Sequence, residues 1–168
     1  GTLVLAWIWL KQALVAETNF RRAMENSVLT GMRALDLEGR ITYVNAAFCQ
    51  MTGWSESELV GRTAPFPYWP DTDHETLTQM LNEELAGKFT PGGVQMRVKR
   101  PDNTLFDARL YVSPLIDARG LQIGWLGTVL DITERKRLAE REARQVEAQA
   151  QAARLTMLGE IASTLAHE

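Results

Sequence analysis

The 168-residue chain contains little of several features that mark common functional classes. Cys49 is its one cysteine, so an intrachain disulfide is impossible and the composition fits a reducing compartment. The net charge is −3, and the chain therefore lacks the excess of Lys and Arg that nucleic-acid-binding proteins carry. We expect a globular protein from a reducing compartment, with no nucleic-acid partner.

The chain also lacks an apolar run of the length that a bilayer requires. Its longest run, residues 2–10, has nine residues, whereas a spanning helix needs about 20. Two tryptophans of this run lie beside Lys11, a combination typical of the interfacial end of a membrane helix. We therefore expect residues 1–10 to be the end of a transmembrane helix, followed by a linker helix at residues 11–28. The alternative is the start of an amphipathic helix that is buried in a dimer.

Strand and helix patterns alternate through the middle of the chain. Residues 32–37 and 40–44 have the pattern of two strands, and Glu38-Gly39 between them predicts a tight turn and hence a hairpin. A short helix is predicted next, with Asn45 at its start and Gly53 as its C-terminal cap.

Two further helices are predicted before the chain returns to strands. Ser55 and Glu58 form a capping box for a short helix at residues 56–60. Three prolines then break the chain into a loop. A longer helix starts at Asp71 or Thr72 and gathers its apolar residues on one face.

Three more strands complete the predicted domain, at residues 94–100, 105–115 and 121–130. Apolar and polar residues alternate along the first of them, as expected of a strand with one buried face. Together with the hairpin, these strands predict an α+β domain in which a five-stranded antiparallel sheet carries helices on one face.

From Ile132 onward the sequence is polar and helical. Small and apolar residues recur at heptad spacing, at Ala139, Ala143, Val146, Ala150, Ala153 and Met157. The spacing changes to four and four at Ile161 and Leu165, which shifts the packing register. We expect a coiled-coil helix that joins two copies in a parallel homodimer. His167 lies roughly 150° from the centre of the apolar face, so its imidazole would stay in water.

Several pieces of the chain occur in the order that is typical of a PAS domain, at residues 36–48, 52–55, 58–61 and 131–136. On these pieces, residues 20–135 resemble a PAS domain, and residues 154–168 resemble the H-box of a sensor histidine kinase. The resemblance implies a PAS domain at 29–133, a coiled-coil signalling helix at 134–154 and the start of a dimerisation and phosphoacceptor domain at 155–168.

The resemblance implies that the parent protein is an ATP-dependent histidine kinase of a two-component system. Such a kinase would lie at the bacterial inner membrane, with this segment in the cytoplasm. His167 would attack the γ-phosphate of ATP and later pass the phosphoryl group to an aspartate of a response regulator. Glu168 would accept or orient the ring proton. ATP and Mg would bind a domain that these 168 residues do not include, so we expect this segment to be inactive alone.

The exit from the predicted sheet resembles a PAS signal-transmission motif, carried by Asp131, Thr133 and Arg135. Asp131 ends the last predicted strand and is a natural N-cap for the following helix. The resemblance implies an ion pair between Asp131 and Arg135 that fixes the angle between sheet and helix.

A small-molecule pocket between the sheet and the helices is a further prediction. Its candidate lining residues are aromatic side chains and arginines, namely Tyr43, Phe48, Tyr68, Trp69, Arg97, Arg109 and Tyr111. An inward-facing arginine would favour a small anionic ligand such as a carboxylate. Residues 67–70 and 113–117 also resemble sensors related to C4-dicarboxylate kinases. The alternative is a domain that binds nothing and only relays a signal.

Two residues raise cofactor alternatives. His74 lies early in a helix from which oxygen-sensing PAS kinases ligate haem, but its sequence neighbours are those of a solvated first turn. Cys49 lies on a short helix, and the chain lacks the Asn-Cys-Arg motif of flavin-adduct photosensors. We predict no cofactor and no metal in this segment. The functional alternative that stays open is a ligand- or cofactor-binding PAS module of a non-kinase signalling protein.

Overall fold

The computed structural model describes residues 1–27 and 30–167, with the side chains of residues 20–27 excepted. The chain divides into two compact units, one up to Asp131 and one from Ile132 onward. The predicted domain boundary between residues 28 and 29 lies outside the described residues.

The first helix, α1 (Thr2–Ser27), joins the apolar run and the predicted linker helix without a break. Across the described part of the chain, no helix combines the length and the apolar character that a membrane crossing takes.

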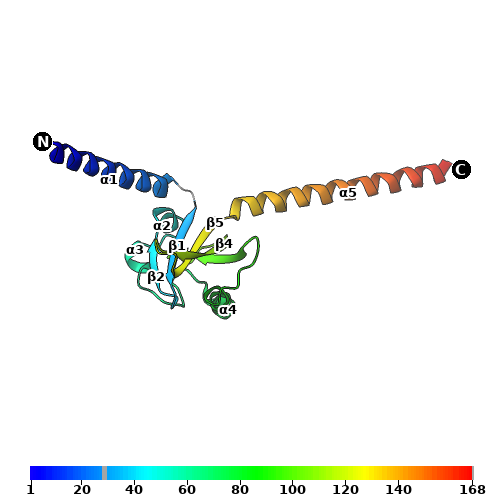
Figure 1. Ribbon diagram of the computed structural model, residues 1–168. Helices are drawn as coiled ribbons and strands as arrows, with labels where there is room; N and C mark the ends of the chain where they lie inside the picture. Colours follow the sequence, from blue (N-terminus) through cyan, green and yellow to red (C-terminus); the bar gives the residue numbers. More distant parts are fainter. Residues whose placement is uncertain (28–29, 168) are drawn as a thin grey trace. The chain divides into compact units, whose positions relative to one another are not determined.

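The sheet has five strands in the order β2-β1-β5-β4-β3, and every neighbouring pair is antiparallel (Figure 1). The strands are β1 (Gly31–Asp36), β2 (Ile41–Val44), β3 (Val94–Lys99), β4 (Leu105–Ile116) and β5 (Gln122–Asp131). The predicted sheet is confirmed. Its one pairing between distant parts of the chain brings β1 beside β5, which makes these the central strands with β4.

The helical elements between β2 and β3 supply the other half of the core. They are α2 (Ala46–Thr52), α3 (Glu56–Leu59), the 3-10 turn η1 (Asp71–Asp73) and α4 (His74–Leu85). Phe48, Leu59 and Leu77 from these helices belong to the same buried cluster as Leu35 and Val98 from the sheet. Burial of this apolar surface holds the α+β domain together.

The predicted caps of α2 and α3 are confirmed, whereas the start of α4 differs from the prediction. Gly53 caps α2 in the left-handed conformation, at a φ of 77°, and the capping box of α3 is present. The longer helix begins later than predicted, because residues 71–73 form a 3-10 turn in which the Asp73 N–H donates to the Pro70 carbonyl at 3.0 Å. Neither Pro70 nor Asp73 caps with its side chain, so this tighter turn satisfies the first donors instead.

One loop forms backbone hydrogen bonds to both edge strands of the sheet. Ile41 of β2 donates its N–H to the Arg62 carbonyl at 2.9 Å and accepts the Gly61 N–H at 2.8 Å. At the other edge, the Lys99 N–H of β3 donates to the Tyr68 carbonyl at 2.8 Å. These bonds hold the loop against the sheet and fix Tyr68 and its neighbours in the core.

The second unit consists of α5 (Thr133–His167), a single helix of 35 residues that is about 52 Å long. None of its residues is buried. The Lys136 N–H donates to the Ile132 carbonyl at 2.9 Å, so Ile132, rather than the predicted Asp131, occupies the N-cap position. The long helix predicted beyond the sheet is confirmed.

Asn45 connects the start of α2 to the sheet. Its buried side-chain oxygen accepts the N–H groups of Met32 and Phe48, both at 2.9 Å. Its side-chain amide donates to the Thr30 carbonyl at 3.1 Å. One side chain therefore caps the helix and also satisfies a backbone donor of β1.

We expect Asn45→Ala to lower the free energy of unfolding by about 2 kcal/mol, because it removes the cap and leaves the buried N–H of Phe48 and the partly buried N–H of Met32 without an acceptor. Urea denaturation measures this change. Asn82→Ala, at an exposed position of α4, is the matched control and should change the free energy by less than about 0.5 kcal/mol. Equal losses in the two variants would contradict the role given to Asn45.

Candidate functional site

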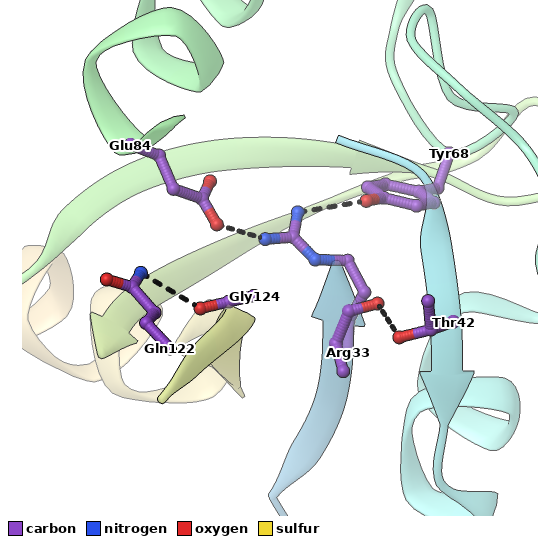
Figure 2. A network of polar contacts seen from close by, with 7 residues as sticks. Arg33, Thr42, Tyr68, Glu84, Gln122 and Gly124 are labelled. Carbon is purple, nitrogen blue, oxygen red and sulfur yellow. Dashed lines mark hydrogen bonds and ion pairs between the residues drawn. The ribbon is translucent and has the colours of Figure 1, made fainter. Parts of the chain in front are cut away.

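The buried centre of the first unit holds an arginine that forms a polar network. Arg33 lies in β1 with 4% of its surface exposed. Its Nη2 donates to Oε1 of Glu84 at 2.7 Å, and its Nη1 donates to the Tyr68 hydroxyl at 3.2 Å (Figure 2). The network thus joins β1, the last turn of α4 and the loop before η1.

The spacing of the sequence explains why both charged residues face inward. Arg33 lies two residues before the buried Leu35, so the two side chains share one face of β1. Glu84 lies three residues after Leu81 and seven after Leu77, so it continues the buried stripe of α4. Strand and helix periodicity therefore bring the two charges into the same core.

The glycine opposite Arg33 provides space for the guanidinium. Gly127 of β5 is the register partner of Arg33. A Cβ at Gly127 would lie 2.9 Å from Nη2 of Arg33 and 3.1 Å from a methyl carbon of Leu110. A larger residue at this position would push the guanidinium from its place.

The surroundings of Arg33 keep it charged. Burial lowers the pKa of Arg33, but Tyr68 and Glu84 raise it by more, and the net shift is upward. Burial raises the pKa of the Tyr68 phenol, and Arg33 opposes this shift only in part. The network is therefore an arginine cation held by Glu84 and by a neutral phenol.

A cavity of about 60 Å³ lies beside this network. Arg33, Glu84 and Trp69 line it, together with apolar residues of α4, β3 and β4 such as Leu77 and Met96. Lys88 and Glu83 complete the charged part of its wall, so two positive and two negative side chains surround it. The wall has no net charge.

The predicted pocket residues separate into two groups. Trp69 lines the cavity, Tyr68 contacts Arg33, and Phe48 packs edge-on against Tyr68 with ring centroids 5.4 Å apart. Tyr43 is half-buried on β2 and is not among the residues that line the cavity.

The predicted arginines lie elsewhere. Arg97 is exposed on β3, where its Nη2 donates to Asp73 at 2.8 Å and the hydrogen bonds from Arg97 lower the pKa of that carboxyl. Arg109 of β4 donates to the Gly92 carbonyl at 2.9 Å, and Tyr111 is 40% exposed. The expected inward arginine exists, but it is Arg33.

Sequence reasoning missed both Arg33 and Glu84, although their spacing carried a signal. Charged side chains are seldom buried, so an arginine within a strand argues by its type alone against a position in the core. The alternation with Leu35 and the step from Leu77 through Leu81 would have placed Arg33 and Glu84 on the inner faces.

The two residues considered for cofactors lie near the surface of the core. His74 is half-buried at the start of α4, with Nε2 at 3.7 Å from Asp71 and its ring 6.3 Å from the Trp69 ring. Cys49 is half-buried on α2, where burial raises the pKa of its thiol. Among the described residues, no three His, Cys, Asp or Glu side chains are grouped so as to hold a metal ion.

The predicted transmission and phosphoacceptor residues lie toward the C-terminus. Asp131 is the last residue of β5, and Thr133 begins α5, with Arg135 exposed in its first turn. His167 is exposed at the last residue of α5. Glu168 lies outside the described residues.

A family model described as "PAS fold" matches residues 19–132 of the chain. The C4-dicarboxylate transport sensor protein DctS of Rhodobacter capsulatus is 47% identical over 92% of this chain and 24% of its own length. The probable diguanylate cyclase DgcE of Escherichia coli is 31% identical over 73% of this chain and 11% of its own length. Sporulation kinase C of Bacillus subtilis is 28% identical over 99% of this chain and 42% of its own length. The chain therefore spans only about a quarter of DctS and less than half of the kinase.

Removal of the Glu84 carboxylate should strongly destabilise the first unit, because it leaves the Arg33 cation buried and unpaired. We expect Glu84→Ala to lower the free energy of unfolding by about 3–5 kcal/mol. Glu83→Ala, one residue earlier at an exposed position, is the matched control and should cost less than about 0.5 kcal/mol. Chemical denaturation of both variants measures the difference, and a loss of similar size at both positions would show that Glu84 does not hold Arg33.

Proposed function

The chain belongs to the PAS family, and from this membership we propose that it is the sensory or relay segment of a sensor histidine kinase. Residues 29–133 would receive a signal, and α5 would carry it to His167. The likeness to sporulation kinase C supports this proposal, since it extends over nearly the whole chain and so includes α5. The parent protein would be anchored at the bacterial inner membrane with this segment in the cytoplasm.

The observation that carries the proposal is the apolar surface of α5. Val146, Met157, Ile161 and Leu165 are each more than half exposed along one uninterrupted helix. An exposed row of large apolar residues marks an interaction surface. From Val146 to Met157 the row has heptad spacing, with alanines between, and this part fits the same helix of a second copy in a parallel coiled coil. The proposed assembly is therefore a homodimer joined along α5.

The chemistry that we propose for His167 follows from its exposure at the end of α5. A neutral imidazole in water is a competent nucleophile. Its nitrogen would bond to the γ-phosphorus of ATP while the bond to ADP breaks. Glu168 would take or orient the ring proton, and an aspartate of a response regulator would later accept the phosphoryl group. ATP and Mg would be held by a further domain of the parent protein.

Asp131, Thr133 and Arg135 are the proposed transmission residues, because they stand where the last strand gives way to α5. In this proposal a signal changes the angle or the register of α5, and the change controls access of the kinase domain to His167.

The second candidate function is a PAS module that serves a non-kinase output. The likeness to a probable diguanylate cyclase over 73% of the chain favours it. In that case His167 would have no chemical role. The next experiment separates the two.

We expect His167→Gln to abolish phosphorylation of the full-length parent protein when it is incubated with γ-labelled ATP. His74→Gln is the matched control, since these are the two histidines of the chain and His74 should keep full labelling when replaced. Phosphotransfer to the cognate response regulator should be lost with His167 alone. Full labelling of His167→Gln would contradict the role given to His167, and a lack of labelling of the unaltered parent protein would favour the non-kinase alternative.

We also expect that rotating the C-terminal part of α5 about the helix axis changes phosphorylation of the parent kinase. One residue inserted after Ala148 rotates everything beyond it by about 100° and should move the basal phosphorylation level of the parent kinase far from that of the unaltered protein. Insertion of seven residues at the same place adds one heptad, keeps the seam aligned and should preserve regulation. Unchanged phosphorylation after a one-residue insertion would contradict the proposal that the angle or register of α5 controls access to His167.

A further inference from the structure

The buried guanidinium of Arg33 carries one donor that nothing in the described structure accepts. Nη1 is taken by Tyr68 and Nη2 by Glu84, but Nε is buried and has no hydrogen-bond partner among the described residues (Figure 2). An unsatisfied donor on a buried cation is rare and costly. Its presence indicates that the site can accept one more oxygen atom.

The position of the free donor defines the chemistry of the missing group. Nε and Nη2 are neighbouring donors of the guanidinium and match the two oxygens of a single carboxylate. We call this pair of donors the fork. Glu84 contacts Nη2 with Oε1 alone, at 2.7 Å, so it uses only one of the two donors of the fork. Glu84 reaches Arg33 from the end of a helix, whereas a freely diffusing carboxylate could turn to engage both donors.

The surroundings of the fork can receive such a group. Arg33 and Glu84 both line the cavity of about 60 Å³, and the guanidinium packs directly against Gly127, where no side chain competes for its place. While Glu84 is in place the charges of the wall cancel, so an added anion would meet no net attraction. Departure of Glu84 would expose one positive charge and add the volume of its side chain to the cavity.

We propose that Arg33 and Glu84 form a carboxylate-exchange site. A small carboxylate of two to four carbons displaces Glu84, bridges Nε and Nη2 of Arg33, and places its short body against the apolar wall at Leu77 and Met96. Glu84 then moves toward solvent beside Lys88, and the last turn of α4 loses its polar connection to β1. The proposal concerns the core of the first unit and holds whether or not His167 is phosphorylated.

The test is a titration of the 168-residue chain with acetate, propionate and succinate, with acetamide as the uncharged counterpart. The backbone and Arg33 Nε–H signals are followed by ¹⁵N NMR. We expect a carboxylate to shift the Nε–H signal and acetamide to leave it unchanged. Glu84→Gln removes the internal competitor, so its apparent Kd for the carboxylate should be lower by about tenfold or more.

Three variants make the outcome decisive. The double variant Arg33→Met, Glu84→Gln should lose binding, while Arg97→Met, the same substitution at an exposed arginine, should keep it. Gly127→Ala pushes the guanidinium from its place while both charged residues are kept, and it should weaken binding. The proposal is overturned if folded Glu84→Gln binds none of the three carboxylates, or if Gly127→Ala and the double variant bind as well as the unaltered chain. Where Glu84→Gln does not fold, Gly127→Ala and the Nε–H signal of the unaltered chain decide.

Discussion

A guanidinium in the middle of a strand must be matched by the elements around it, and Arg33 places this requirement on the PAS core. The cation cannot be deprotonated and cannot reach water, so it needs a carboxylate, and Glu84 supplies one from the last turn of α4. It needs a second acceptor, which the Tyr68 hydroxyl provides. It also needs space, which Gly127 leaves on the neighbouring strand. A loop, a helix and two strands are thus positioned by one side chain.

Patterns among residues close together in the sequence predict most of this domain, but they do not predict the ion pair between Arg33 and Glu84. The hairpin around Glu38-Gly39, the cap at Asn45 and the left-handed Gly53 depend on residues a few positions apart, so the sequence alone predicts them. The contact between Arg33 and Glu84 joins residues 51 positions apart. Each lies on a buried face by its own periodicity, yet only the sheet order shows that the two faces meet. Which face of the sheet an arginine occupies depends on its position relative to the buried residues of its strand, so residue type alone does not separate Arg33 from Arg97 and Arg109.

The second unit is stabilised by other interactions than the first. A helix of 35 residues with no buried side chain gains little from packing against itself, so its stability as an isolated helix comes from backbone hydrogen bonds and propensity. Its alanines and long polar residues supply that propensity, and its row of large apolar residues adds nothing until a partner covers it. The extent of the helix therefore follows from sequence, and the start at Thr133 differs from the expected one only by the residue that takes the N-cap.

The loop that bonds to Ile41 at one edge of the sheet and to Lys99 at the other has a further consequence. Edge strands with free backbone groups recruit strands from other molecules, which leads to domain swapping and fibrous aggregation. Here the carbonyls of Arg62 and Tyr68 and the N–H of Gly61 already occupy the edges at those points. The loop that bonds to both edge strands thereby opposes the addition of a further strand at these points.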